Sequence, residues 1–404
     1  MNLHELLNYN LLLIQKEKTS GNSMTHPKSW VNKDEVLYLT KENIVQFNEG
    51  LEQIYTSNKN IYTKFTRQKI YDYIEGELVK KKKANEVFSE QDEENFFSLF
   101  EQQKPHKKYI IAPISGIRLD NVDKINISIF EIGKENQLKS ILSNDTDGYY
   151  IAVQIDKIYD DLIAIEEAKN KFLDFIRLIV FLSGKNDKEI FIKTGLPSYP
   201  SMSHEQMYVE TSSYHITENI QDEFPSSQMN SIYLEKIPVD NPFFCEHENF
   251  IKLWGIYEKK HSSKNISKME ARLLNASIAI GESSLSKSIK NSIIYTSMAF
   301  EILFSFDEGS LFQKSIADRL ADTFAFVVAK DKETRLGTIK SVKEFYRLRS
   351  ALVHGGDTKI NNDYVAFNRL LSAVISEFLN NERYKHVKKI DDLYKMVREA
   401  QNSY

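Results

Sequence analysis

The sequence contains a single cysteine, Cys245, among 404 residues, so an internal disulfide is excluded. One free cysteine fits a reducing compartment, and we expect a cytoplasmic protein. The segment from Met1 to Leu13 has no basic region ahead of its apolar stretch and makes a poor signal peptide. The most apolar run, Phe172 to Leu182, contains charged residues and is too short to cross a bilayer. We therefore predict a core helix there and no membrane partner.

Excess positive charge is also missing. The chain has 53 Lys and Arg against 57 Asp and Glu, which gives a net charge of −4. General nucleic-acid binders are normally basic, so any contact with RNA must be local. The sequence has no glycine-rich phosphate loop and no Cys and His cluster at metal-ligand spacing, and we expect neither a cofactor nor a metal. Cys245 and His247, two residues apart, are interpreted as structural.

What is present is apolar material for a large core. Apolar residues make up 41% of the chain and aromatic residues 12%, so disorder is not expected. A length of 404 residues allows two domains. Pro238 to Pro242 is the best linker candidate. We predict an α+β domain over residues 1–240, followed by an all-α helical bundle over residues 241–404.

Periodicity supplies the elements of the first domain. Helical spacing of apolar residues predicts helices at Lys41–Tyr55, Asn60–Val79 and Ala164–Leu182. Three strands of a small, antiparallel sheet are predicted at Tyr109–Ile114, Ile125–Ile129 and Tyr149–Ile155. Ile190–Ile192 and Met207–Glu210 are predicted as further short strands. The run Lys80–Lys83 has two interpretations, an RNA-facing patch or a solvated helix end. The second is favoured, because such runs are usually solvated and an acidic patch follows at Glu90–Glu94.

Beyond the linker the pattern is helical throughout. The predicted helices are Glu246–Lys260, Ser267–Gly281, Lys287–Phe306, Leu311–Ala329, Glu333–His354, Tyr364–Leu379 and Tyr384–Ala400. This succession is typical of a helical bundle. Five basic residues near the end form a possible basic groove, interrupted by acidic ones: Lys385, Lys388, Lys389, Lys395 and Arg398.

The fifth of these helices ends in a stretch that can carry chemistry. Leu348, Ala351 and Leu352 recur at helical spacing and can face a core, and Gly355-Gly356 then ends the helix. His354 is therefore expected at the helix C-terminus, where the exposed carbonyls favour a protonated imidazole. Arg349 lies one and a half turns upstream. A fixed cation and a group that titrates near neutral pH together suit a phosphodiester.

This stretch, from Tyr346 to Gly355, resembles the HEPN superfamily, and most closely its Apea-like branch. The helix Ala299–Phe304 supports the resemblance, because it is similar to that branch's Ala-Leu-Glu-Ala-Leu-Phe segment. The resemblance covers roughly residues 245–385. It implies a metal-independent endoribonuclease with a composite site in a homodimer or a higher even oligomer. It also implies a role in bacterial anti-phage defence by abortive infection. Because an enzyme that is toxic to its own cell needs restraint, we expect residues 1–240 to be the sensor or regulator, with a phage-derived trigger as its partner.

The same resemblance assigns roles to the residues of the motif. Arg349 and His354 would be catalytic, the first holding phosphate oxygens and the second moving protons to and from RNA oxygens. Tyr346 either contacts RNA or belongs to the core, and Ser350 either binds substrate or is a tolerated small residue. Many nuclease members carry Asn, Asp or His at the position of Ser350. The alternative function is therefore a non-catalytic HEPN dimerisation, scaffold or nucleotide-binding protein.

Glu301 is a charged residue within an apolar helix segment. A carboxylate in such a position needs a partner. Arg319 and Arg349 are the two arginines considered, and a structural role for the pair is favoured over a catalytic one.

Overall fold

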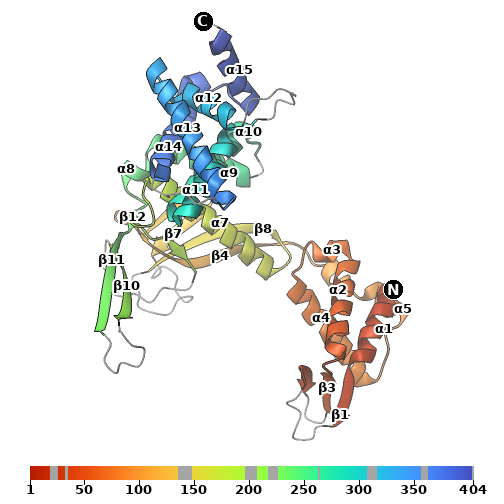
Figure 1. The fold of residues 1–404 in the computed structure, drawn as a ribbon. Coiled ribbons are helices and arrows are strands. Elements are labelled where there is room, and N and C mark those ends of the chain that lie inside the picture. The colour runs from red at the N-terminus through yellow and green to blue at the C-terminus, as the bar shows by residue number, and fades with distance from the viewer. Residues whose placement is uncertain are drawn as a thin grey trace. The chain divides into compact units, whose positions relative to one another are not determined.

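The computed structural model describes residues 1–18, 26–31, 35–134, 148–195, 207–216, 226–262, 264–306, 316–355 and 363–402. The chain divides into two compact units (Figure 1). The first comprises residues 1–110 and 154–169, and the second comprises residues 111–153 and 170–404. Strands in the first two-thirds and a mostly helical last part agree with the predicted order of fold types.

The first unit packs helices around a small sheet. Helix α1 (Leu3–Leu13) lies against α2 (Asn43–Ser57) and α4 (Arg67–Ala84). The sheet is antiparallel, in the order β1-β3-β2, with β1 at Gln15–Lys18, β2 at Lys28–Val31 and β3 at Glu35–Leu39. Short helices complete the unit: α3 (Lys59–Tyr62), α5 (Glu90–Asn95) and α6 (Ser98–Glu101). Its core contains Leu7, Phe47, Phe65 and Ile74, all 1% exposed or less.

The helix predicted at Asn60–Val79 is interrupted between α3 and α4. Thr66 is the N-cap of α4, and both its backbone N–H and its hydroxyl donate to Asp160 Oδ2, at 2.8 and 2.7 Å. The run Lys80–Lys83 lies in the last turns of α4. Lys81 forms ion pairs with Glu86 and Asp92, so this run is a helix end, as favoured from the sequence.

A five-stranded sheet in the order β6-β7-β8-β4-β9 underlies the second unit. Its strands are β4 (His106–Ser115), β6 (Lys124–Ile127), β7 (Phe130–Lys134), β8 (Tyr149–Ile158) and β9 (Lys193–Thr194). The antiparallel pairing of β6 with β7, β7 with β8 and β4 with β9 confirms that prediction. Strand β4 is longer at both ends than the predicted Tyr109–Ile114. Ile190 forms only an isolated bridge with Glu235, so the predicted strand at Ile190–Ile192 is replaced by β9.

Smaller strands and one long helix accompany this sheet. Strands β10 (Met207–Ile216) and β11 (Ser226–Glu235) form an antiparallel hairpin, and β12 (Ile237–Pro238) pairs in parallel with β5 (Ile117–Arg118). Helix α7 (Asp161–Ser183) supplies the core helix predicted around Phe172 to Leu182, with Phe175, Leu178 and Ile179 fully buried.

The remaining chain is helical, as predicted. The helices are α8 (Pro242–Cys245), α9 (Glu248–His261), α10 (Lys268–Leu285), α11 (Ile289–Phe304), α12 (Ile316–Val328), α13 (Lys332–Val353), α14 (Asp363–Asn380) and α15 (Ile390–Asn402). A 3₁₀ turn, η3 (Glu382–Tyr384), precedes α15. In Figure 1 helices α9 to α15 lie on one side of the five-stranded sheet. The bundle core is formed by α10 to α15, with Phe300, Phe304 and Phe324 fully buried.

The two compact units do not follow the domain boundary expected near residue 240. Trp254 of α9 packs against Phe130 of β7 and Phe175 of α7, with ring centroids 5.9 and 5.5 Å apart. Ser128 donates a hydrogen bond to the carbonyl of Trp254 at 3.2 Å. The sheet and α7 bury their apolar faces under helices that come after residue 240, so the strands from residue 111 onward belong with the bundle.

Within the described ranges, every helix is too short or too polar to span a bilayer.

Candidate active site

Helix α13 carries the motif and ends where the sequence predicts. Asp331 and Thr334 form a capping box at its start. Its last helical residue is Val353, and His354 is the C-cap, with its backbone N–H donating to the carbonyl of Ser350 at 3.0 Å. Gly355 has a φ of +77°, a left-handed conformation that glycine adopts at little cost. The second glycine of the pair, Gly356, lies outside the described residues.

The inward face of α13 fixes how the motif is presented. Val342, Phe345 and Leu352 are buried, and Leu348 is half-buried against the bundle core. The ring of Phe345 stacks on Phe367 of α14, with centroids 4.3 Å apart and planes at 28°. These contacts set the rotation of the helix about its axis, so residues off this face point away from the core.

Arg349 is the half-buried member of the motif. Its side chain is 32% exposed, and its Nη2 lies 3.7 Å from Glu301 Oε1 on α11. Arg349 Nε is buried without a hydrogen-bond acceptor among the described residues. A guanidinium that is one-third exposed and has one carboxylate neighbour keeps N–H donors on its exposed side for an anion such as phosphate.

Glu301 has a second contact that orders the site. Tyr346 donates its hydroxyl to Glu301 Oε1 at 3.0 Å, and its ring lies 5.8 Å from that of Phe300. Burial, together with the charge of Glu301 and this hydrogen bond, raises the pKa of Tyr346 above its usual range. Tyr346 is therefore a neutral donor that fixes the carboxylate, and most of its ring belongs to the core.

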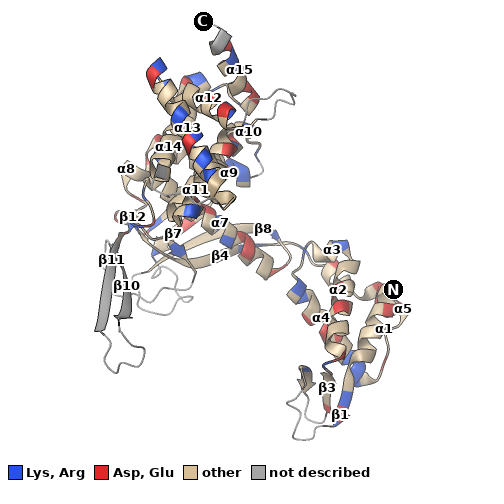
Figure 2. Ribbon diagram, viewed as in Figure 1, with Lys and Arg blue, Asp and Glu red and all other residues tan. Residues whose placement is uncertain are grey.

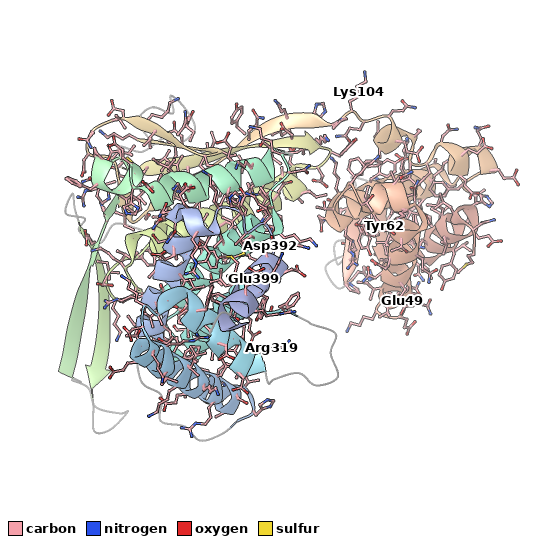
Figure 3. All side chains as sticks on the ribbon, turned by 90° about the horizontal axis from the view of Figure 1, so that it is seen from above. Glu49, Tyr62, Lys104, Arg319, Asp392 and Glu399 are labelled. Atoms are coloured by element: carbon pink, nitrogen blue, oxygen red, sulfur yellow. The ribbon has the colours of Figure 1, made fainter. Side chains whose placement is uncertain are left out.

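The partner of Glu301 is thus Arg349, one of the two arginines considered. Arg319 of α12, labelled in Figure 3, donates from Nη1 to the carbonyl of Phe306 at 2.8 Å. The sequence indicates that Glu301 needs a partner, because it is a carboxylate in an apolar helix segment, but it does not identify that partner. The structure gives it two partners, both on the motif helix.

Ser350 and His354 are exposed. Neither contacts the Glu301–Tyr346–Arg349 cluster through its side chain in any hydrogen bond or ion pair described for these residues. The structure therefore brings Tyr346 and Arg349 together around Glu301, and it leaves Ser350 and His354 open to solvent at the end of the same helix. An exposed histidine is available to a ligand, whereas a histidine buried in the bundle would not be.

A buried polar network holds α11, which carries Glu301, against its neighbours. Thr296 donates to Asn368 Oδ1 on α14 at 2.8 Å, and Asn368 Nδ2 donates to Ser283 Oγ on α10 at 3.0 Å. The hydroxyls of Ser283 and Thr296 lie 2.9 Å apart. Because buried polar groups must be paired, this network restricts how the three helices can pack, and it positions Glu301 one and a half turns further along α11.

The surroundings of the site carry both signs of charge. Along the helices of the second unit, Lys and Arg alternate with Asp and Glu (Figure 2). Lys343 on α13, for example, pairs with Asp318 on α12 at 2.5 Å. Among the residues that the structure describes, basic and acidic side chains therefore occur together on the helices of this unit.

The described part of the chain has no cluster of three or more His, Cys, Asp and Glu side chains suited to a metal ion. His247, which lies two residues from Cys245, is the N-cap of α9 and accepts the backbone N–H of Asn249 through Nδ1 at 3.2 Å. Its role is structural, as interpreted from the sequence.

Comparisons with known proteins find no relative: no family model, no curated protein and no solved structure matches the chain.

Proposed function

We propose that this protein is a metal-independent endoribonuclease of the Apea-like HEPN type. The observation that carries the proposal is the end of α13. There a half-buried Arg349, held by Glu301, precedes an exposed His354 at the helix C-cap by five residues. A fixed cation and a proton carrier are the two groups that cleavage of RNA through its own 2′-hydroxyl requires.

The chemistry assigns one task to each side chain. One histidine takes the proton of the 2′-hydroxyl as that oxygen attacks the phosphorus. A second histidine gives a proton to the departing 5′-oxygen, so the products are a 2′,3′-cyclic phosphate and a 5′-hydroxyl. Arg349 binds the non-bridging phosphate oxygens, on which charge builds up in the transition state.

One chain supplies a single histidine at this position, so two copies are needed. Five residues along a helix correspond to a rotation of about 140°, and Arg349 and His354 of one chain do not share a narrow face. A two-fold axis beside the end of α13 would bring both residues of both chains to one groove. Exposed apolar side chains support such a contact: Val353 is 48% exposed next to His354, and Met298, one turn before Glu301, is 43% exposed.

The biological role we infer is anti-phage defence through degradation of cellular RNA. An enzyme of this kind harms its own cell and requires restraint. The first compact unit, with its own core, can serve as the sensor or regulator that supplies it.

The test is direct. Purified full-length protein is incubated with tRNA and with total RNA in EDTA, and the product ends are determined. We expect cleavage with 2′,3′-cyclic phosphate ends, loss of cleavage in His354→Ala and Arg349→Ala, and unchanged cleavage in His386→Ala, which removes another exposed histidine of the same unit.

Two results would overturn the proposal. One is wild-type cleavage by His354→Ala or by Arg349→Ala. The other is tight RNA or nucleotide binding without cleavage, which would favour the non-catalytic scaffold or nucleotide-binding alternative.

A further inference from the structure

A second concave site lies in the bundle, between α9, α10, the C-terminal end of α14 and η3. Its cavity volume is about 320 Å³. The site is far from the motif along the fold. Phe378 in its wall follows Phe367, the residue that stacks on Phe345 of α13, by eleven residues of α14, which correspond to about 17 Å.

The floor of this pocket is apolar. It is formed by Ile256, Met269, Leu273, Phe378, Tyr384 and Val387. Phe378 and Tyr384 pack ring against ring, with centroids 4.7 Å apart, and expose only 7% and 3% of their surface. Gly255 of α9 leaves the pocket open, because a Cβ added there would have no atom within 4 Å. A flat apolar group can therefore reach the floor past this glycine.

The rim is cationic. Four lysines, Lys252, Lys259, Lys385 and Lys388, line the pocket with a single acidic residue, Glu270. Three of the ammonium groups have carboxylate neighbours: Glu248 at 3.2 Å, Glu270 at 3.3 Å and Glu382 at 3.2 Å. Lys388 has no carboxylate partner for its side chain in the part of the chain that the structure describes.

Lys388 is also fixed in place by its backbone. Its carbonyl accepts the N–H of Met269 at 2.8 Å, and its own N–H donates to Asp392 Oδ2 at 2.9 Å. The basic tail therefore divides. Lys389 and Lys395 lie near Asp391 and Glu399, at 4.0 and 3.9 Å, whereas Lys385 and Lys388 line the pocket. The structure therefore divides the basic groove considered from the sequence: part of it is paired with acidic residues, and part of it lines the pocket.

We propose that this pocket binds a free mononucleotide. An apolar floor beneath a cationic rim fits a ligand with a flat, weakly polar body and a phosphate. A volume of about 320 Å³ restricts that ligand to the size of one nucleotide. The site is separate from Arg349 and His354 and does not depend on the nuclease proposal.

The experiment is isothermal titration calorimetry of the full chain with AMP, GMP, CMP and UMP, and with adenosine and inorganic phosphate as part-ligands. At least one mononucleotide is expected to bind, with each part-ligand at least tenfold weaker, because both the floor and the rim contribute. Absence of binding by all four nucleotides would overturn the proposal.

Two variants locate the binding. Gly255→Leu fills the pocket from an open helix position, and at least a tenfold loss is expected; Gly76→Leu, at an equally open glycine of α4, is the matched control. Lys388→Glu should weaken binding about tenfold, as expected for a phosphate contact, while Lys330→Glu, at an exposed lysine outside the pocket, should not. Wild-type affinity in Gly255→Leu, or equal affinity in both lysine variants, would refute the site.

An RNA end could supply the same chemistry as a free nucleotide. An uncleavable, 2′-O-methyl hexanucleotide with a 5′-phosphate is therefore added as a competitor. Binding of the mononucleotide without competition supports a free nucleotide. Competition in the wild type, together with direct binding of the hexanucleotide that is at least tenfold tighter than that of the mononucleotide and is weakened by Gly255→Leu, would assign the pocket to RNA ends and contradict the proposal.

Discussion

The two compact units use their partly buried charges differently. In the first, Asp160 is 3% exposed and accepts three hydrogen bonds, two from Thr66 and one from the backbone of Leu162. In the second, Arg349 is one-third exposed, has one carboxylate neighbour and retains a buried Nε without an acceptor among the described residues. A buried carboxylate such as Asp160, which accepts three hydrogen bonds, stabilises the fold. A guanidinium such as that of Arg349, which has unpaired donors, can still bind a ligand. This difference is the reason for proposing the site in the second unit.

The largest effect on RNA cleavage is expected at Arg349, and an arginine of the first unit, Arg67, serves as its control. Arg349 and Arg67 each pair with one glutamate, at 3.7 and 2.8 Å, the first in the second unit and the second in the first unit. Arg349→Ala should lower the rate of RNA cleavage by about a thousandfold, because it removes the cation that meets the phosphate. Arg67→Ala should leave the rate unchanged. Equal losses in a single-turnover assay would abolish the contrast between the units.

The second-largest effect on RNA cleavage is expected at the proposed dimer contact. Val353→Glu places a charge beside His354 on an apolar patch and should both shift the protein to monomers and lower cleavage by about a hundredfold. Leu336→Glu changes another exposed apolar residue of α13, 60% exposed and seventeen residues earlier, and should change neither. Sedimentation equilibrium and the cleavage rate measure the two effects. A monomeric Val353→Glu variant that cuts RNA normally would exclude the composite site.

Glu301 should have an intermediate effect, because it holds Arg349 without being placed on the substrate. Glu301→Gln keeps the size of the side chain and an acceptor for Tyr346 but removes the charge. We expect kcat to fall about tenfold with little change in melting temperature. Tyr346→Phe, which keeps the ring, should cost less than Glu301→Gln. A large drop in melting temperature without a change in kcat would make Glu301 purely structural.

The smallest effect on cleavage is expected at Asp160. Asp160→Asn should destabilise the first unit by about 1–3 kcal/mol, because a carboxylate with three donors loses part of its hydrogen bonding, and cleavage well below the unfolding temperature should be unchanged. Burial alone would raise the pKa of Asp160, but the hydrogen bonds from Thr66 and Leu162 and the charge of Lys69 outweigh it and lower the pKa below 3.8.

The sign of the pH dependence follows from that lowered pKa. The stabilisation by Asp160 is complete above about pH 4 and is lost as the pH falls through the lower pKa of the folded state. The free energy of unfolding, measured with urea between pH 5 and pH 2, should therefore fall more steeply with decreasing pH in the wild type than in Asp160→Asn. The same decrease of stability with falling pH in both proteins would show that the charge of Asp160 does not stabilise the fold.

Apolar spacing in the sequence indicates where individual elements lie but not how they group. Helices α9 to α14 and strands β4, β6 and β8 lie where apolar spacing places them, because that spacing is set by local geometry. The expected boundary near residue 240 differs from the compact units, because the packing of Trp254 on Phe130 joins segments more than a hundred residues apart. Local periodicity carries no information about which apolar faces meet.

The candidate site shows the same division. The sequence alone determined that a helix ends just before Gly355 and that His354 lies at the C-terminus of this helix, because helix caps depend on local backbone preferences. It also places Arg349 five residues before His354. Tertiary packing alone decided that Glu301 meets Arg349 and Tyr346 and that His354 is left exposed. Those contacts join α11 to α13 across the bundle core, and only the complementary shapes of buried side chains can select them.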